Sequence, residues 1–291
     1  MKLVTFQRSN NTGYRVGALI SDTEIADLTS LTSKEGLSAF DVLDCFDLDG
    51  EFYEAALAAV FSSDISIVKR GDVKLASPVP RPGKIICIGL NYRDHAAESG
   101  MEIPKSPITF SKYSSCAIGP NEPILIPEGC TQLDYEAELA FIIGRRARYV
   151  NRDKALDYVF GYANFNDVSA RDFQFADGQW QRGKACETFA PMGEFIATAD
   201  EIADPQDLTI KLRLNGETMQ DSNTCQMIFG VAELIEFLSR HITLEPGDVV
   251  ATGTPPGVGF ARKPPVYMKD GDRVEVEITG LGVLSNPVSN V

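Results

Sequence analysis

The apolar positions of this chain fall mainly into short runs or strict alternation, which is the pattern of β-strands. Residues 84–89 (Lys-Ile-Ile-Cys-Ile-Gly) form a continuous apolar run, whereas residues 274–278 alternate Val-Glu-Val-Glu-Ile. The clearest helical stripe is in residues 227–239, where apolar side chains recur at spacings of three and four. Because strands predominate and no strand–helix repeat recurs, we expect a mostly-β or α+β fold.

Residues 133–143 carry the most informative pattern, Leu-Asp-Tyr-Glu-Ala-Glu-Leu-Ala-Phe-Ile-Ile. We predict one β-strand here, and side chains two apart in a strand share a face, so Asp134, Glu136 and Glu138 would point the same way. Three carboxylates on one face repel each other and are tolerated either in water or around a cation. The spacing alone leaves both alternatives open and favours an acidic strand that faces solvent.

The first 70 residues are expected to form a small separate α/β unit. Residues 2–6 and 14–20 have strand patterns joined by a polar turn at 10–13, and residues 51–61 carry a helical apolar face. The acids of this unit are scattered, with no arrangement that suggests chemistry. We therefore interpret residues 1–70 as a cap or docking module.

A proline-rich segment separates this unit from the rest of the chain. Pro78, Pro80 and Pro82 occupy alternate positions, and each proline disfavours helix in the residue before it. We predict that residues 71–83 form an extended connector and that residues 84–291 form the main domain.

Composition narrows the possible partners. The net charge of −14 and the lack of a clustered basic run argue against a nucleic-acid partner. No apolar run approaches membrane-spanning length, and the N-terminal residues do not resemble a signal peptide. The six cysteines include no Cys-x-x-Cys pair, so reduced thiols are expected. These observations predict a cytoplasmic or organelle-matrix protein without a membrane partner.

One of the two histidines lies beside an acid in a short predicted helix. Residues 91–100 end at a glycine, and His95 and Glu98 are three apart, which makes them neighbours on one helical face. This pair has two interpretations. It is either a surface histidine beside an acid, or a dyad in which the carboxylate orients the imidazole as a general base.

Two further segments have an ambiguous pattern. Asp167 ends the strand pattern of residues 161–167 and is followed by Arg171, an arrangement common in sites, although aspartate is as common at helix N-termini. Residues 252–259 (Thr-Gly-Thr-Pro-Pro-Gly-Val-Gly) lack the Gly-Lys-Ser/Thr ending of a phosphate loop. They form either a plain connection or a loop whose small residues allow its backbone to approach a ligand.

Taken together, these segments resemble the fumarylacetoacetate hydrolase superfamily over roughly residue 84 to the C-terminus. The chain looks closest to the branch that holds the second type of fumarylacetoacetate hydrolase domain-containing proteins and the bacterial diketo-deoxy sugar acid hydrolases. The matching motifs occur in the family's order: Asn91-Tyr92 with His95 and Glu98, Glu136-Ala137-Glu138, residues 167–172, Gly178-Gln179-Trp180, Gly183-Lys184, residues 252–259 and residues 263–266.

The resemblance implies a mixed β-sandwich roll, a homodimer and one divalent metal, Mg²⁺ or Mn²⁺. The residues that match the family's metal ligands are Glu136, Glu138 and Asp167. An all-oxygen, anionic ligand set selects hard cations and disfavours zinc, in agreement with the implied metal. Asp134 matches no ligand of the family and is expected to lie behind the ligands or on the surface.

The resemblance also implies roles for residues around the metal. Lys184 is expected to contact the carboxylate or enolate oxygen of a substrate. Arg171 and Gln174 are expected to contact the carboxylate end of the substrate, and Thr254 to line the pocket. His95 and Glu98 match the dyad that activates water in hydrolases of the family.

We therefore expect an enzyme that acts on a short 2-oxo or 2,4-diketo acid through a metal-stabilised enolate. Hydrolysis of a C–C bond in an acylpyruvate is the first hypothesis. Decarboxylation or tautomerisation of oxaloacetate on the same metal site is the alternative, and a non-catalytic binding protein is the alternative of another class. The animal enzyme that cleaves fumarylacetoacetate has a longer N-terminal domain, which argues against that substrate here.

Overall fold

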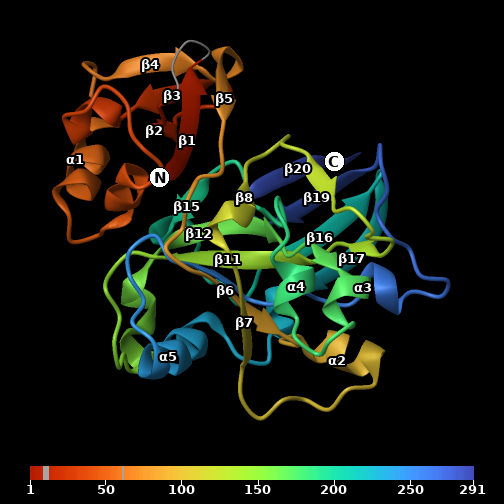
Figure 1. Cartoon of the computed structure of the whole chain (residues 1–291). Coiled ribbons are helices and arrows are strands. Elements are labelled where there is room, and N and C mark those ends of the chain that lie inside the picture. Colours follow the sequence, from red (N-terminus) through yellow and green to blue (C-terminus); the bar gives the residue numbers. More distant parts are fainter. Residues whose placement is uncertain (9–12, 61) are drawn as a thin grey trace.

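A long mixed β-sheet runs through the whole molecule (Figure 1). The computed structural model describes residues 1–8, 13–60 and 62–291, so most of the predicted turn at 10–13 and residue 61 of the predicted helix lie outside the described residues. The sheet has eleven strands, of which β18 and β6 are parallel neighbours and β5 (Val73–Leu75) pairs only with β1. Its order is β4 (Ser66–Lys69), β3 (Glu24–Asp27), β2 (Arg15–Leu19), β1 (Lys2–Arg8), β15 (Ile196–Thr198), β12 (Val159–Asn166), β11 (Ala137–Ile143), β18 (Val249–Ala251), β6 (Ile85–Gly89) and β7 (Ile108–Lys112).

A second sheet of five strands packs against the centre of the first one. Its strands β16 and β19 lie against β11 and β12, as Figure 1 shows. Two smaller pairs, β10 (Leu133–Asp134) with β13 (Ser169–Ala170) and β8 (Ala117–Ile118) with β14 (Ala190–Pro191), complete the strands. The order of the second sheet is β17 (Glu217–Asn223), β16 (Thr209–Leu214), β19 (Arg273–Ile278), β20 (Gly282–Asn290) and β9 (Ile124–Ile126).

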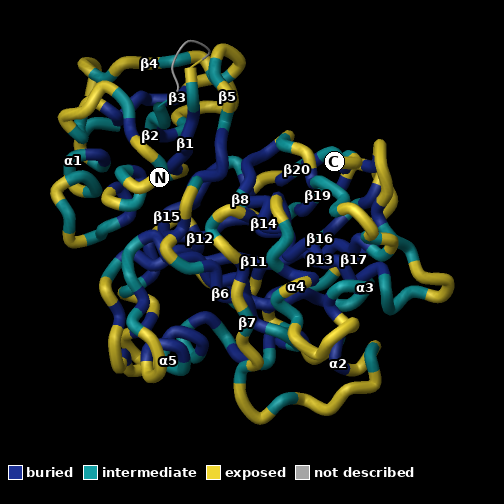
Figure 2. The backbone as a smooth tube through the Cα atoms, in the orientation of Figure 1, coloured by how far each residue is buried: buried dark blue, intermediate teal, exposed yellow. Residues whose placement is uncertain are grey.

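Alternate side chains of β11 belong to two apolar cores. Leu139 and Phe141 pack among residues of the second sheet, whereas Ala140 and Ile142 pack in a core on the opposite face that reaches the N-terminal strands. Both faces of the strand are covered, and all of β11 is buried (Figure 2). Its sequence is therefore apolar along most of its length. The predicted mostly-β, α+β fold is confirmed.

The N-terminal residues gather on one side of the molecule around α1 (Glu51–Ala59), but their strands continue the main sheet (Figure 1). Strand β1 pairs with β15 through Lys2 and Leu3, which face Ala197 and Ile196. Strand β5, which lies inside the expected connector, pairs with the other end of β1, through Phe6 to Arg8, on the edge opposite β2. The predicted division at residue 70 remains a prediction.

Helices are few and short apart from α5 (Val231–His241). The predicted helix at 227–239 begins four residues late, because Met227 pairs with Tyr92 and the side chain of Asn91 exchanges two hydrogen bonds with the backbone of Phe229. The other helices are α2 (Arg93–Ser99), α3 (Arg171–Gln174) and α4 (Gln181–Lys184). The 3₁₀ helices are Thr29–Thr32, Asp41–Phe46, Arg70–Asp72, Ser114–Cys116, Arg152–Tyr158, Ala199–Glu201, Thr224–Gln226 and Gly259–Ala261.

Three local features are visible only in the structure. Residues 179–189 include α4, and Ser169 with Ala170 form β13. Strand β20 follows the alternating strand at 274–278 and pairs with it from Ile278 back to Arg273. Strand β20 contains Pro287, serines and asparagines, so its composition hides a strand that tertiary pairing imposes.

The cysteines and helices agree with the expectations from composition. All six cysteines are free thiols, and Cys45, Cys87 and Cys116 are buried. Among the residues that the structure describes, no helix has both the length and the apolar character needed to cross a membrane.

We predict that Gly161 tolerates no side chain. A Cβ at this position would lie 2.2 Å from the carbonyl oxygen of Ala197 on the neighbouring strand β15, and backbone in a sheet cannot yield. Gly161→Ala should therefore lower the free energy of unfolding by about 1–3 kcal/mol, measured as a lower melting temperature. Gly71→Ala is the control, because a Cβ at Gly71 meets open space. Equal melting of Gly161→Ala and wild type would contradict this prediction.

Candidate metal centre

Residues 133–143 form two strands in place of the single predicted one. Strand β10 ends at Asp134 and β11 begins at Ala137, so Tyr135 and Glu136 lie between two different pairings. Side chains replace the missing strand partners in this break. The amide oxygen of Asn166 accepts a hydrogen bond from the Glu136 N–H (3.0 Å), and that of Gln220 accepts one from the Ala137 N–H (2.9 Å).

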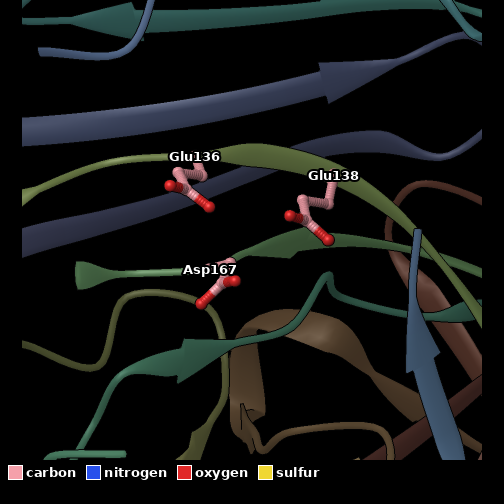
Figure 3. Close-up of side chains that lie close together, drawn as sticks. All are labelled: Glu136, Glu138 and Asp167. Atoms are coloured by element: carbon pink, nitrogen blue, oxygen red, sulfur yellow. The ribbon is translucent and has the colours of Figure 1, made fainter. Parts of the chain in front are cut away.

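The break places three buried carboxylates around one point. Glu136, Glu138 and Asp167 each offer an oxygen, and these oxygens lie within 4.8 Å of one another (Figure 3). Asp167 reaches the group because Asn166 pairs with Ala137 in the ladder and the Asp167 N–H donates to the Glu136 carbonyl (2.9 Å). All three side chains are buried, so the alternative of a solvent-facing acidic strand is wrong.

Two predicted cationic residues contact this triad. Nζ of Lys184, at the end of α4, lies 2.7 Å from Glu136 Oε2 and 2.9 Å from Asp167 Oδ2. The Arg171 guanidinium donates to Glu136 Oε1 (2.6 Å), Asp134 Oδ2 (2.8 Å) and the side-chain oxygen of Gln174 (3.0 Å). Asp134 therefore lies behind the triad as a partner of Arg171, in agreement with its exclusion from the ligand set.

Lys112 is a third cation that the sequence interpretation missed. Its fully buried Nζ lies 2.7 Å from Asp167 Oδ1 and donates to the backbone carbonyls of Val168 (2.9 Å) and Lys184. The contact between Nζ and Asp167 Oδ1 is an ion pair that lacks the angles of a hydrogen bond. In the sequence Lys112 ends an ordinary strand pattern, which does not distinguish it from a surface lysine.

The electrostatics of the triad fit a divalent cation. Burial opposes ionisation of Glu136, but Lys184 and Arg171 outweigh it and lower the pKa of Glu136 to about 2. Burial and the neighbouring carboxylates of Asp167 and Glu136 raise the pKa of Glu138 well above its usual range. A cation between the three groups would remove this repulsion. The all-oxygen donor set suits the predicted Mg²⁺ or Mn²⁺.

The glycine- and proline-rich loop is more than a plain connection. Its backbone N–H groups donate to three different carboxylates: Gly253 to Glu138 Oε2 (2.9 Å), Gly257 to both oxygens of Glu98 (3.1 Å each), and Gly259 with Phe260 to the two oxygens of Asp134 (2.7 and 3.1 Å). The loop therefore ties the triad to the helix that carries His95.

The predicted dyad lies on α2. His95 Nδ1 is 3.3 Å from Glu98 Oε2, so a proton on Nδ1 can be held by Glu98 while Nε2 remains for other chemistry. The base of the helix is fixed by Asn91, whose amide nitrogen donates to the Thr252 carbonyl (2.8 Å), and by Asp94, which accepts from Ser222 Oγ (2.5 Å). His95 is largely buried, which argues against the surface-histidine alternative.

The structure thus brings the predicted residues into one connected network. The triad, Lys184, Arg171 and Gln174 are joined by direct contacts, while His95, Glu98 and Thr254 connect to it through the loop at 252–260. Sequence reasoning missed Lys112, Asn166 and Gln220, whose role is visible only through their partners. The functional roles of the predicted residues stay predictions.

Comparisons with known proteins bear on this network. Residues 84–289 match the family described as fumarylacetoacetate (FAA) hydrolase C-terminal. The chain is 43% identical, over 99% of its own length and 90% of the relative, to a mitochondrial oxaloacetate tautomerase of Xenopus laevis.

Solved structures agree over the whole chain. A fumarylacetoacetate hydrolase from Exiguobacterium antarcticum superposes with a TM-score of 0.84 at 36% identity, and all of both chains is covered. A maleylpyruvate hydrolase from Sphingobium sp. SYK-6, in complex with manganese(II) and pyruvate, gives a TM-score of 0.83 at 34% identity, covering 100% of this chain and 99% of that one.

We predict that Mn²⁺ or Mg²⁺ raises the melting temperature of the wild-type protein, because a ligand that binds only the folded state stabilises it. Glu138→Gln should weaken metal affinity about 10- to 100-fold or more, measured by calorimetric titration. The metal-free variant should melt no lower than wild type, because the substitution removes a repelling carboxylate.

Glu128→Gln provides the matched control, since Glu128 is exposed and outside the triad. This variant should keep the metal-dependent rise in melting temperature. Undiminished metal affinity in Glu138→Gln would show that the triad is not the metal site.

Proposed function

We propose that this chain, which belongs to the fumarylacetoacetate hydrolase family, is a divalent-metal enzyme that interconverts the keto and enol forms of oxaloacetate. The observation that carries this proposal is the buried carboxylate triad with the Lys184 ammonium against two of its members, because a divalent cation held there would, together with Lys184, place positive charge beside an enolate oxygen. Similarity to an oxaloacetate tautomerase over almost the entire chain supports the choice among reactions of the family.

In this proposal Glu136, Glu138 and Asp167 hold Mg²⁺ or Mn²⁺. When bound, such an ion supplies Lewis-acid polarisation of the 2-oxo group of the substrate. The manganese and pyruvate complex of the related maleylpyruvate hydrolase supports both the metal and a 2-oxo acid as its neighbour.

The cationic residues then bind and orient the substrate. The Lys184 ammonium adds charge beside the 2-oxo oxygen, and its pKa remains raised despite burial because Asp167 and Glu136 favour the charged form. Arg171 and Gln174 receive a carboxylate of the substrate, and Thr254 lines the same pocket. The two carboxylates of oxaloacetate would suit charge-assisted hydrogen bonds from Lys184 and Arg171.

His95 is the proposed base. With Nδ1–H directed to Glu98, its Nε2 can take a proton from C3 of oxaloacetate, and the enolate takes up a solvent proton at its C2 oxygen. The imidazolium then releases the proton from C3 to solvent, which restores the neutral base. The reverse reaction uses the same groups, so no bond between carbon atoms breaks. Glu98 stabilises the charged imidazole during the transfer.

The His95–Glu98 dyad favours one second candidate, hydrolysis of an acylpyruvate. Here His95 would activate a water molecule that attacks the distal carbonyl, and the C–C bond would break to leave the enolate of pyruvate. Decarboxylation of oxaloacetate would form the same enolate by loss of CO₂ without water. Similarity to relatives named as enzymes argues against a non-catalytic binding protein. A homodimer and a cytoplasmic location stay predictions.

The deciding experiment compares three substrates with the Mn²⁺-loaded protein. Keto–enol exchange of oxaloacetate, pyruvate formation from oxaloacetate and cleavage of acetylpyruvate are followed separately. We expect keto–enol exchange to be fastest and His95→Ala to lower its kcat by about 10²- to 10⁴-fold, because the general base is lost.

His241→Ala is the matched control, since His241 is exposed at the end of α5 and should leave the rate unchanged. Cleavage of acetylpyruvate without accelerated keto–enol exchange would replace the tautomerase by the hydrolase. Full exchange activity in His95→Ala would remove His95 from the mechanism.

A further inference from the structure

Gln220 connects three parts of the site that are distant in sequence. It lies on β17 of the second sheet and is 1% exposed. Its side-chain oxygen accepts from the N–H of Ala137 (2.9 Å), the residue between the two glutamates of the triad. Its side-chain nitrogen donates to Thr254 Oγ1 (2.8 Å) and to the carbonyl of Pro255 (2.8 Å).

The partners of Gln220 determine the direction of its amide. A backbone N–H can only donate and a backbone carbonyl can only accept, so Ala137 faces the amide oxygen and Pro255 faces the amide nitrogen. A flipped amide would oppose two donors at Ala137 and two acceptors at Pro255. The nitrogen is therefore also the group that faces Thr254.

This direction has a consequence for the Thr254 hydroxyl. A hydroxyl has one proton to donate and can accept through its lone pairs. Because Thr254 Oγ1 accepts from Gln220, its own proton is not engaged in that contact. Within the described residues, no hydrogen bond donated by Thr254 Oγ1 to a protein group is found.

Thr254 is the next residue after a contact with the triad. The preceding residue, Gly253, donates its N–H to Glu138 Oε2 (2.9 Å), and the Thr254 side chain is 6% exposed. A buried hydroxyl with a free proton, one residue from a candidate metal centre, suits an acceptor with negative charge such as the carboxylate of a metal-bound acid.

We propose that Gln220 is a positioning residue that makes Thr254 a hydrogen-bond donor to the carboxylate of a 2-oxo acid. Gln220 does not touch the substrate. It fixes the acceptor side of the Thr254 hydroxyl, and at the same time it holds that hydroxyl at a fixed position relative to Ala137, the residue between Glu136 and Glu138. This inference rests on the proposed function, because it assumes a 2-oxo acid as ligand.

The test is a double-mutant cycle on the binding of pyruvate to the Mn²⁺-saturated protein, measured by calorimetry. Thr254→Val removes the hydroxyl and should lower the affinity for pyruvate about 10- to 100-fold, the size expected for a hydrogen bond to a charged group. Gln220→Met should lower this affinity by a similar factor. The double variant should bind no more weakly than Thr254→Val alone, because Gln220 acts through Thr254.

A second variant covers the case in which Gln220→Met folds poorly. Gln220→Glu has nearly the same shape and still accepts from Ala137, but in its ionised form it cannot donate to Thr254. The Thr254 hydroxyl would then donate to the new carboxylate, and pyruvate affinity should fall as in Thr254→Val.

Gln206→Met is the matched control for loss of a bridging amide. Gln206 accepts from the Val231 N–H (2.7 Å) and donates to the Thr224 carbonyl (3.4 Å), outside the network around the triad. We expect this variant to have a lower melting temperature and an unchanged affinity for pyruvate.

Each outcome of the cycle decides the question. If the two fold-decreases in pyruvate affinity multiply in the double variant, Gln220 does not act through Thr254 and supports the fold only. If Thr254→Val binds pyruvate as tightly as wild type, the hydroxyl donates to no ligand. Either result overturns this inference and leaves the proposed function intact. A wild-type protein that binds no pyruvate with Mn²⁺ present would overturn both.

Discussion

The burial of charge at one place is the constraint on which the rest of the structure depends. Four carboxylates and three cationic side chains lie together out of water: Asp134, Glu136, Glu138, Asp167, Lys112, Arg171 and Lys184. With all groups ionised, four negative and three positive charges leave a net charge of −1. Removal of one partner from a buried ion pair typically costs about 3–5 kcal/mol, so the paired groups, Lys112, Arg171 and Lys184 with Asp134, Glu136 and Asp167, need their partners. A divalent cation reverses the sign of this cluster to +1, which suits an anionic substrate.

The backbone around the cluster is shaped to satisfy these charges. The loop at 252–260 directs N–H groups at carboxylates on three separate elements, β11, α2 and β10, and this requires conformations that only glycine adopts easily. Gly253 and Gly257 have φ values of +97° and +101°, and a Cβ at Gly257 would lie 2.1 Å from the Met219 carbonyl oxygen. The loop is therefore glycine-rich because its backbone is a binding group, and a phosphate ligand is not required to explain it.

The arrangement also explains why one site serves several reactions in the family. Under the proposed function, tautomerisation, decarboxylation and C–C hydrolysis would all pass through an enolate, and a metal in the triad together with Lys184 would stabilise that charge in the same way in each. The reactions differ in which proton or bond is broken next to the enolate. In the proposal that choice lies with His95 on α2, a helix whose Glu98 accepts from the Gly257 N–H of the glycine-rich loop.

Local pattern was sufficient for much of this protein. The alternating and continuous apolar runs predicted the strands β1, β2, β6, β11, β12 and β19, because periodicity is a property of the sequence itself. The order of the motifs carried the family resemblance, which implied Glu136, Glu138 and Asp167 as ligands, and their all-oxygen chemistry agreed with a hard divalent metal. The tertiary structure alone decided the break at Tyr135 and Glu136, the pairing of β20 despite its composition, and the inclusion of Lys112 and Gln220. Those features depend on partners outside the local segment: Lys112 meets Asp167, and Gln220 meets Ala137, across more than fifty residues. No local pattern records which side chain will meet an unpaired N–H or a buried carboxylate.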